Sequence, residues 1–87
     1  MFEMYLKGEV RNVSVKEFTR RNGDKDVAYN MLLEGRTGSR MIPVTKGIYE
    51  DFVRGSLEKG NCIELCGEYN PQFQYNQFVV EDYKIVS

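Results

Sequence analysis

The sequence lacks histidine and tryptophan entirely and has only two cysteines and two prolines in 87 residues. Without histidine, a zinc site would need two thiolates completed by carboxylates, which is an uncommon ligand set. We also find no nucleophile with an evident base and no acid pair whose spacing predicts a catalytic cleft. We therefore expect a protein that is not an enzyme, with no cofactor, no metal and no small-molecule substrate.

Long apolar runs are missing as well. No run is long enough to cross a bilayer, and the first ten residues, MFEMYLKGEV, carry acids and a lysine where a signal peptide needs an apolar stretch. We expect a cytoplasmic protein without membrane contact. The length predicts one domain, residues 1–87, because a chain of this size has no room for a second core.

The two cysteines, Cys62 and Cys66, lie four residues apart in a segment that alternates as a strand does. At about 3.3 Å per residue their Cα atoms would be about 13 Å apart. A disulfide needs less than about 7 Å, so we expect two structural thiols that do not pair with each other.

The charged residues are unevenly distributed, although the net charge is only −1. Residues 1–46 hold nine Lys/Arg against six Asp/Glu, or +3, and residues 47–87 hold three against seven, or −4. Two interpretations of residues 1–46 stay open. Their strands could have ordinary solvated faces on which interleaved acids neutralise the cations, or the cations could form a basic surface. The basic residues between positions 11 and 40 are Arg11, Lys16, Arg20, Arg21, Lys25, Arg36 and Arg40.

Alternating apolar residues and regularly spaced glycines predict five strands and one short helix. We expect strands over residues 4–18, 26–34, 40–44, 61–69 and 77–86. The apolar phase changes within the first strand, which indicates a bulge or bend, and Gly8 makes bending there cheap. The last strand has apolar residues in both phases, as a strand covered on both sides would.

The helix is expected between Thr45, a good N-cap, and Gly55, a good C-terminal stop. Ile48, Phe52 and Val53 would form its apolar stripe, and Leu57 would fill the core from the following loop. Three strands, a helix and two more strands predict an all-β domain with one short helix, a five-stranded Greek-key OB-fold barrel with the helix between strands 3 and 4.

Two unusual segments fall where an OB-fold binds its ligands, which is the face of strands 2 and 3 with the loops joining strands 1–2 and 4–5. The Asn-Gly turn at residues 20–25 is the first loop and is basic. The stretch YNPQFQYNQF, residues 69–78, is the second, with four aromatics and no charge. We interpret Tyr69 and Phe78 as the feet of this hairpin, and Phe73 and Tyr75 as the rings that it presents.

The chain resembles the single-stranded DNA-binding protein family in several short segments. These are LKGEV at residues 6–10, MIPV at 41–44, GSLEKGNCIELCGEY at 55–69 and VVEDYKIV at 79–86. Three departures are the missing tryptophan, a shorter hairpin between strands 4 and 5, and an end directly after strand 5 without an acidic tail. The resemblance implies a divergent minimal member of bacterial or phage type, acting in replication, recombination or mobile-element DNA metabolism.

That resemblance implies a protein that binds single strands largely independently of base sequence, with aromatic rings that stack on the bases and cations that contact the phosphates. The expected nucleic-acid-binding residues are Lys16, Phe18, Arg20, Arg21, Lys25, Tyr29, Arg36, Arg40, Phe73 and Tyr75. Tyr29 alternates with core residues, so it is either interior or part of the stacking surface. Phe73 and Tyr75 contact either bases or another subunit.

The partners that we expect are single-stranded DNA, with RNA as an alternative, and further copies of the chain in a dimer or tetramer. A small sheet with exposed edges and apolar residues on both faces of its last strand has surface left to cover. A rival hypothesis is an OB-fold that serves protein assembly without nucleic acid. The net charge of −1 favours the rival, and the clustered arginines oppose it.

Overall fold

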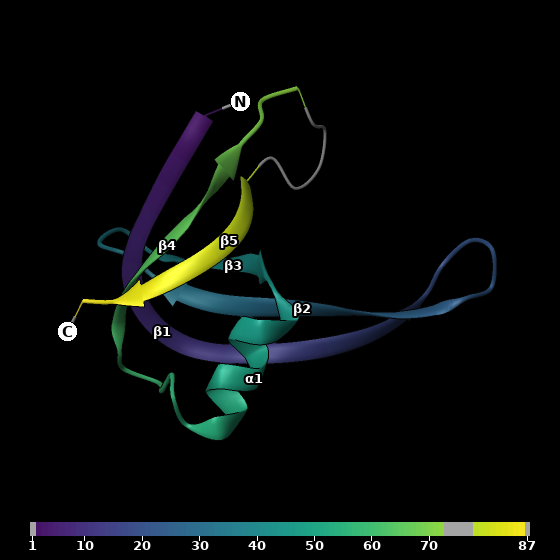
Figure 1. Ribbon diagram of the computed structural model, residues 1–87, viewed down its shortest axis with the longest axis horizontal. Helices are drawn as coiled ribbons and strands as arrows, with labels where there is room; N and C mark the ends of the chain where they lie inside the picture. The colour runs from purple at the N-terminus through teal and green to yellow at the C-terminus, as the bar shows by residue number, and fades with distance from the viewer. Residues whose placement is uncertain (1, 73–77, 87) are drawn as a thin grey trace.

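The computed structural model describes residues 2–72 and 78–86. Its elements are β1 (Phe2–Thr19), β2 (Lys25–Glu34), β3 (Ser39–Val44), α1 (Lys46–Arg54), β4 (Cys62–Tyr69) and β5 (Phe78–Ile85). The strands form one antiparallel sheet in the order β3-β2-β1-β4-β5, with the helix between β3 and β4 in the chain (Figure 1). The predicted element order is confirmed.

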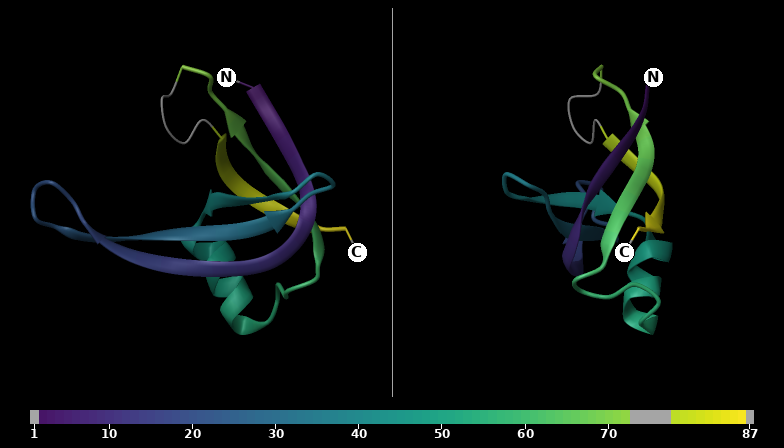
Figure 2. Two further views of the ribbon diagram at one scale, coloured as in Figure 1. Left: turned by 180° about the vertical axis from the view of Figure 1, so that it is seen from behind. Right: turned by 90° about the vertical axis from the view of Figure 1, so that its left-hand side faces the viewer.

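Strand β1 belongs to both halves of the sheet. Its first part pairs with β4, from Phe2 opposite Tyr69 to Glu9 opposite Cys62, and its second part pairs with β2 as far as Thr19. Between these parts the strand bends, so the two halves of the sheet cross at a steep angle (Figure 2). The expected bend is confirmed, and it allows one sheet to enclose a core.

Two features of the sequence produce this bend. The register with β2 shifts between Val10 and Asn12, which makes Arg11 the extra residue of a bulge. At Gly8 the neighbouring strand comes so close that a Cβ atom would lie 2.7 Å from the backbone oxygen of Glu34 and 2.7 Å from Leu33 Cγ. Only glycine fits there without a shift of the backbone.

The core lies between the two halves of the sheet and is closed by the helix. Its fully buried side chains are Met31, Leu57, Ile63, Leu65 and Val10. The predicted role of Leu57 is therefore confirmed. Both cysteines are free thiols, as expected.

The helix begins and ends where the sequence predicts. Thr45 Oγ1 accepts a hydrogen bond of 3.2 Å from the Ile48 amide, and Gly55 has a φ of 87° just after the last turn. The predicted apolar stripe is wrong at Val53, whose side chain is 66% exposed. Five residues after Ile48, Val53 lies about 140° around the helix from it, whereas Phe52 lies about 40° from it and packs on the core.

The sheet is open along one seam, which corrects the expectation of a closed barrel. Within residues 2–72 and 78–86, β3 and β5 are the two edges and are not hydrogen-bonded to each other. A strand of six residues that contains Pro43 has few donors with which to close the seam. The described strands show that β5 is not covered on both sides either, since Val79 is 47% exposed. In the part of the chain that the structure describes, no helix is long and apolar enough to cross a membrane.

Candidate nucleic-acid interface

Strand register decides which side chains of β1, β2 and β3 point away from the core. Residues directly opposite one another share a face, and Val13, Met31 and Ile42 form a buried row across the three strands. The alternate positions therefore form the outward surface, which we call the outer face. It consists of Asn12, Ser14, Lys16 and Phe18 in β1, Asp26, Ala28, Asn30 and Leu32 in β2, and Met41 and Pro43 in β3.

The middle of the outer face is small and uncharged, and an exposed apolar side chain lies at each end, with Asp26 directly opposite Phe18 at one of them. Ser14, Asn30 and Pro43 form the central row. Phe18 is 41% exposed at one end, and Met41, opposite Leu32 at the other end, is 58% exposed. A flat ligand can lie on such a surface, with ring and thioether contacts at its ends and amide hydrogen bonds between them.

Of this surface, the sequence analysis named Lys16 and Phe18 but not Asn30, Leu32 and Met41, which the register places on the same face. A signal was present, because Ala28, Asn30 and Leu32 alternate in the phase opposite to the core residues of β2. An amide in the middle of that phase marks a face that is not packed on the core.

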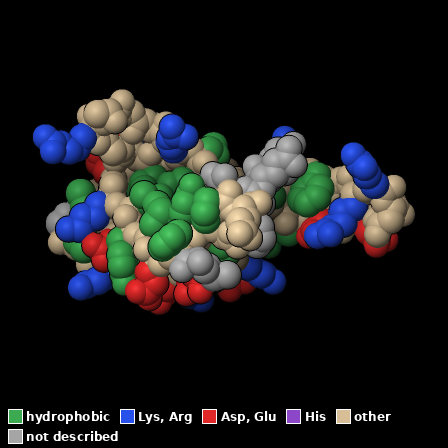
Figure 3. All heavy atoms as spheres, turned by 90° about the horizontal axis from the view of Figure 1, so that it is seen from above, with side chains coloured by type: hydrophobic (Ala, Val, Ile, Leu, Met, Phe, Trp, Pro, Cys, Tyr) green, Lys and Arg blue, Asp and Glu red, His purple; other side chains and the backbone are tan. Residues whose placement is uncertain are grey.

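The turn between β1 and β2 forms the tip of a long hairpin that projects from the rest of the molecule (Figures 1 and 3). The Arg20 amide donates to the Asp24 carbonyl oxygen at 2.7 Å, and Gly23 adopts a φ of 91°. The tip carries Lys/Arg side chains beside acidic ones (Figure 3). Among the described residues, Arg21 and Lys25 make no ion pair.

Arg20 is the exception at this tip, because it is paired with Asp26. Its Nε lies 2.8 Å from Asp26 Oδ2, and its terminal nitrogen forms an ion pair with the same oxygen. The Arg20 hydrogen bonds, helped by the Val27 amide, lower the pKa of the Asp26 carboxyl. Part of the positive charge predicted for the turn is therefore neutralised.

The other predicted cations lie at the opposite end of the hairpin. Arg36 is in the turn between β2 and β3. Arg40 is in β3 opposite the buried Leu33, so it lies on the core side of the sheet and not on the outer face. The ten residues of β2 separate them from the basic tip by about 33 Å. The structure thus divides the expected phosphate track, with the basic tip at one end of the outer face, Arg36 at the other end, and Arg40 on the core side of the sheet.

Tyr29 lies on the core side of the sheet and not on the outer face. It stands opposite Val15 and Val44, and its ring packs against Tyr49 of α1 with centroids 5.1 Å apart. Of the two placements that the sequence left open, the structure has the interior one. Phe18 and Tyr29 therefore do not belong to one stacking surface.

The rings expected from the second binding loop are described only in part. Phe73 and Tyr75 lie outside the described residues. Tyr69 and Phe78 are direct partners across β4 and β5, and Phe78 packs against the core. Their role as the feet of the hairpin is confirmed.

The outward surface formed by the first part of β1 with β4 and β5 is negatively charged, and we call it the acidic face. Its carboxylates are Glu3, Glu9, Glu64, Glu68 and Asp82, and they outnumber the two lysines of the same face, Lys7 and Lys84. Tyr5 lies among them, 55% exposed, and the charge of Glu3 makes the largest contribution to raising its pKa. No cluster of metal ligands is found among the residues that the structure describes.

No protein-family model matches the sequence, and no curated protein does. Solved structures do resemble the chain in three dimensions. The second OB-fold domain of replication protein A from Methanococcus maripaludis is 23% identical with a TM-score of 0.57, and the match covers 99% of this chain and 85% of that one.

A similar likeness is found to the mitochondrial single-stranded DNA-binding protein Rim1 from S. cerevisiae. In one crystal form the TM-score is 0.55 at 17% identity, covering 99% of this chain and 94% of that one. In another form the values are 0.50 and 16%, with coverage of 99% and 96%. These likenesses confirm the predicted OB-fold, and at such identities they establish the fold alone.

Proposed function

We propose that the protein binds single-stranded nucleic acid, above all single-stranded DNA, with little dependence on base sequence. The observation that carries this proposal is the outer face, a surface without net charge that exposes Phe18 near one end and Met41 near the other and has cations beyond both ends. Such a surface provides electrostatic attraction for phosphates and contact area for bases, and it contains no element shaped for a duplex groove.

The cations at the two ends of the outer face act on the backbone of the strand. Arg21 and Lys25 attract phosphates at the tip, and Arg36 attracts them at the far end. Between them the bases lie against Phe18, Asn30 and Met41. Only unpaired bases present a ring face to Phe18, so a single strand is preferred over a duplex.

DNA is proposed over RNA because the structural neighbours include a single-stranded DNA-binding protein. The proposed setting is DNA replication, recombination or phage and mobile-element DNA metabolism in a cytoplasm. The protein acts by binding and not by catalysis. Phe73 and Tyr75 are proposed as further base contacts in the second loop.

Self-association is part of the proposal. The sheet leaves the edges of β3 and β5 unpaired among the described strands, and Val79 and Tyr5 are exposed on the acidic face. Unpaired edges and exposed apolar side chains favour assembly into a dimer or tetramer.

The second candidate function is a protein-interaction module that does not bind nucleic acid. The acidic face favours it, because Glu3, Glu68 and Asp82 would repel phosphates and attract a basic protein. The two candidates differ in which face is used, so charge changes on each face distinguish them.

Fluorescence anisotropy of labelled single-stranded and duplex oligonucleotides over a salt series tests the proposed function. We expect tighter binding of the single strand and an affinity that falls steeply with salt through counterion release. Arg21→Gln should reduce the slope of log affinity against log salt by about 0.7, the value per phosphate on a single strand.

Lys84→Gln is the matched control, because it removes the same charge from the acidic face. It should leave the slope unchanged. Equal effects of the two substitutions would assign the salt dependence to overall charge and not to the outer face. No binding of any oligonucleotide at low salt would reject the proposed function.

A further inference from the structure

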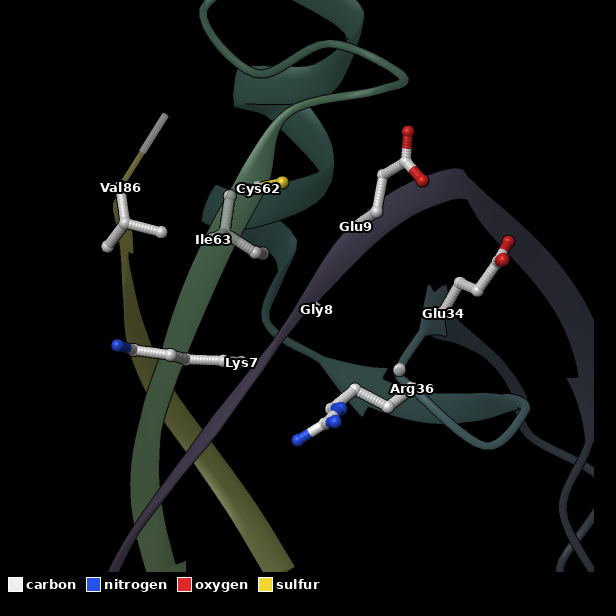
Figure 4. A pocket seen from close by; sticks show the side chains of 9 residues that line it. Lys7, Gly8, Glu9, Glu34, Arg36, Cys62, Ile63 and Val86 are labelled. Atoms are coloured by element: carbon white, nitrogen blue, oxygen red, sulfur yellow. The ribbon is translucent and has the colours of Figure 1, made fainter.

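A pocket lies where β1 bends away from β2 towards β4, apart from the middle of the outer face (Figure 4). Its volume is about 360 Å³. That volume is within the range of pockets for small organic molecules, about 300–1,000 Å³. It is lined by Lys7, Gly8, Glu9, Glu34, Gly35, Arg36, Cys62, Ile63 and Val86.

The floor of this pocket is apolar. Gly8 contributes no side chain, Ile63 is a fully buried core residue, and Val86 borders the opposite side. The missing side chain at Gly8 opens the pocket while it lets β2 approach. A flat apolar group can therefore lie over Gly8 and beside the exposed Val86, whereas Ile63 has no exposed surface to offer it.

The rim has no net charge once the ion pairs of its residues are included, and its cations and acids point to different sides. Arg11 lies 3.6 Å from Glu9 and 3.1 Å from Glu34, but its single positive charge balances only one of these two carboxylates. Arg36 has no ion-pair partner among the described residues. Figure 4 shows Arg36 reaching from the β2–β3 turn towards β1, while the Glu9 and Glu34 carboxylates point to the other side.

An apolar floor with a guanidinium at its rim suits a ligand that joins a flat ring to an anion. Arginine binds phosphate oxygens through two parallel N–H donors, and a nucleobase has an apolar face for the floor. The pocket also borders the end of the outer face that is far from the basic tip, because Arg36 is in the turn that connects β2 to β3. A strand that crosses the outer face from the basic tip would meet this pocket next.

We propose that the pocket holds one nucleotide of a bound single strand, with its phosphate on Arg36 and its base over Gly8 and beside Val86. The proposal rests on the proposed function and adds a discrete subsite to it. It predicts that one position of the strand is held in a pocket while the others lie on an open surface.

The two cysteines allow a direct test. Cys62 lines the pocket, whereas Cys66 lies four residues further along β4, opposite Tyr5 on the acidic face, and both are partly exposed. Alkylation by iodoacetamide is measured in Cys66→Ser, which retains the pocket thiol, and in Cys62→Ser, which retains the other. For each variant the alkylation rate is measured under three conditions: without ligand, with a saturating oligothymidylate, and with thymidine monophosphate.

We expect the oligonucleotide to slow alkylation of Cys62 at least fivefold and to leave Cys66 unchanged. Arg36→Gln in the Cys66→Ser background should restore the rate at Cys62 while anisotropy still shows the strand bound. Unchanged reactivity of Cys62 with the strand bound would reject the pocket but keep the proposed function. Protection by the mononucleotide alone would assign the pocket to free nucleotides and reject the strand subsite.

A tryptophan probe gives an independent result, since the chain has none of its own. Val86→Trp places a fluorophore at the pocket rim, and Val53→Trp places one on the exposed side of the helix as a control. A base in the pocket should quench the first by half or more and the second by less than a tenth. Equal quenching, or none at position 86 with the strand bound, would overturn the proposal.

Discussion

Tyr83 in β5 and Asp51 in α1 are joined by a hydrogen bond of 2.8 Å, in which the phenol donates to Oδ2. Asp51 is fixed on its other side by an ion pair with Arg54. Its backbone carbonyl oxygen also accepts from the Ser56 and Leu57 amides, at 2.9 and 3.2 Å. The bond therefore links the end of the chain to the helix through a residue that cannot easily move.

Removing this hydroxyl should destabilise the fold modestly. We expect Tyr83→Phe to lower the free energy of unfolding by about 1 kcal/mol, the net contribution of a typical hydrogen bond. Urea unfolding followed by circular dichroism measures the change. A variant as stable as the parent would show that the bond adds nothing beyond the ring's packing on the core.

The same residue predicts a loss of stability in alkali. Burial, followed by the hydrogen bond to Asp51, raises the pKa of Tyr83 from 10.0 to about 12. The folded state thus favours the neutral phenol, so its contribution is complete below pH 10 and is lost as the pH rises from 10 to 12. The difference in unfolding free energy between the parent and Tyr83→Phe should narrow over this interval, and a constant difference would contradict the assignment.

Two glycines should respond in opposite ways to alanine. At Gly67, beside the bulge between β4 and β5, a Cβ atom would lie 2.1 Å from the Val79 carbonyl oxygen. We expect Gly67→Ala to cost about 1–3 kcal/mol through overpacking. At Gly47 in the helix the nearest atom would be Thr45 Oγ1 at 3.8 Å, so Gly47→Ala should add about 0.5–1 kcal/mol. Thermal unfolding of the pair tests this, and the same sign for both would contradict it.

Releasing Arg20 should strengthen binding. Asp26→Asn removes the carboxylate that pairs with Arg20 and also takes a negative charge from the outer face. We expect severalfold higher affinity for single-stranded DNA at low salt and an effect on stability below about 1 kcal/mol, since the pair is exposed. Glu68→Gln, on the acidic face, is the control and should change affinity little. Weaker binding by Asp26→Asn would mean that Asp26 orders the hairpin for binding.

Phe18 should contribute to stacking without holding the fold together. We expect Phe18→Ala to weaken single-strand affinity by about 1–3 kcal/mol, the range for one stacked base, and to leave the melting temperature almost unchanged because the ring is 41% exposed. Phe73→Ala with Tyr75→Ala should weaken it similarly. If the rings instead form a subunit interface, sedimentation will show a smaller assembly at unchanged affinity.

Local patterns in the sequence predicted most of the fold. Thr45 and Gly55 mark the helix because capping depends on adjacent residues. Alternation in β4 separates Ile63 and Leu65 from Cys62 and Cys66 because the strand period is two. Val53 misled because a stripe drawn from three apolar residues ignored the angle between them.

The site was predicted less completely, since it depends on contacts between distant segments. The pairing of Arg20 with Asp26 needs the geometry of the turn, and the interior position of Tyr29 needs the helix against which it packs. The pocket combines β1, β2, β4 and the end of β5, so no spacing along the chain indicates it. The open seam between β3 and β5 is equally a property of the folded sheet.

The division of β1 between two partners also sets the order in which the chain can fold. Its second part pairs with β2 across a short turn, with Thr19 opposite Lys25. Its first part pairs with β4, where Phe2 lies opposite Tyr69, a residue far away in the sequence. Pairing over such a separation first costs the conformational entropy of closing a long loop, and the favourable contacts form only afterwards. We expect folding in milliseconds to seconds, with the hairpin of β1 and β2 formed first, and stopped-flow circular dichroism would reveal a slower rate in variants that weaken the pairing of β1 with β4.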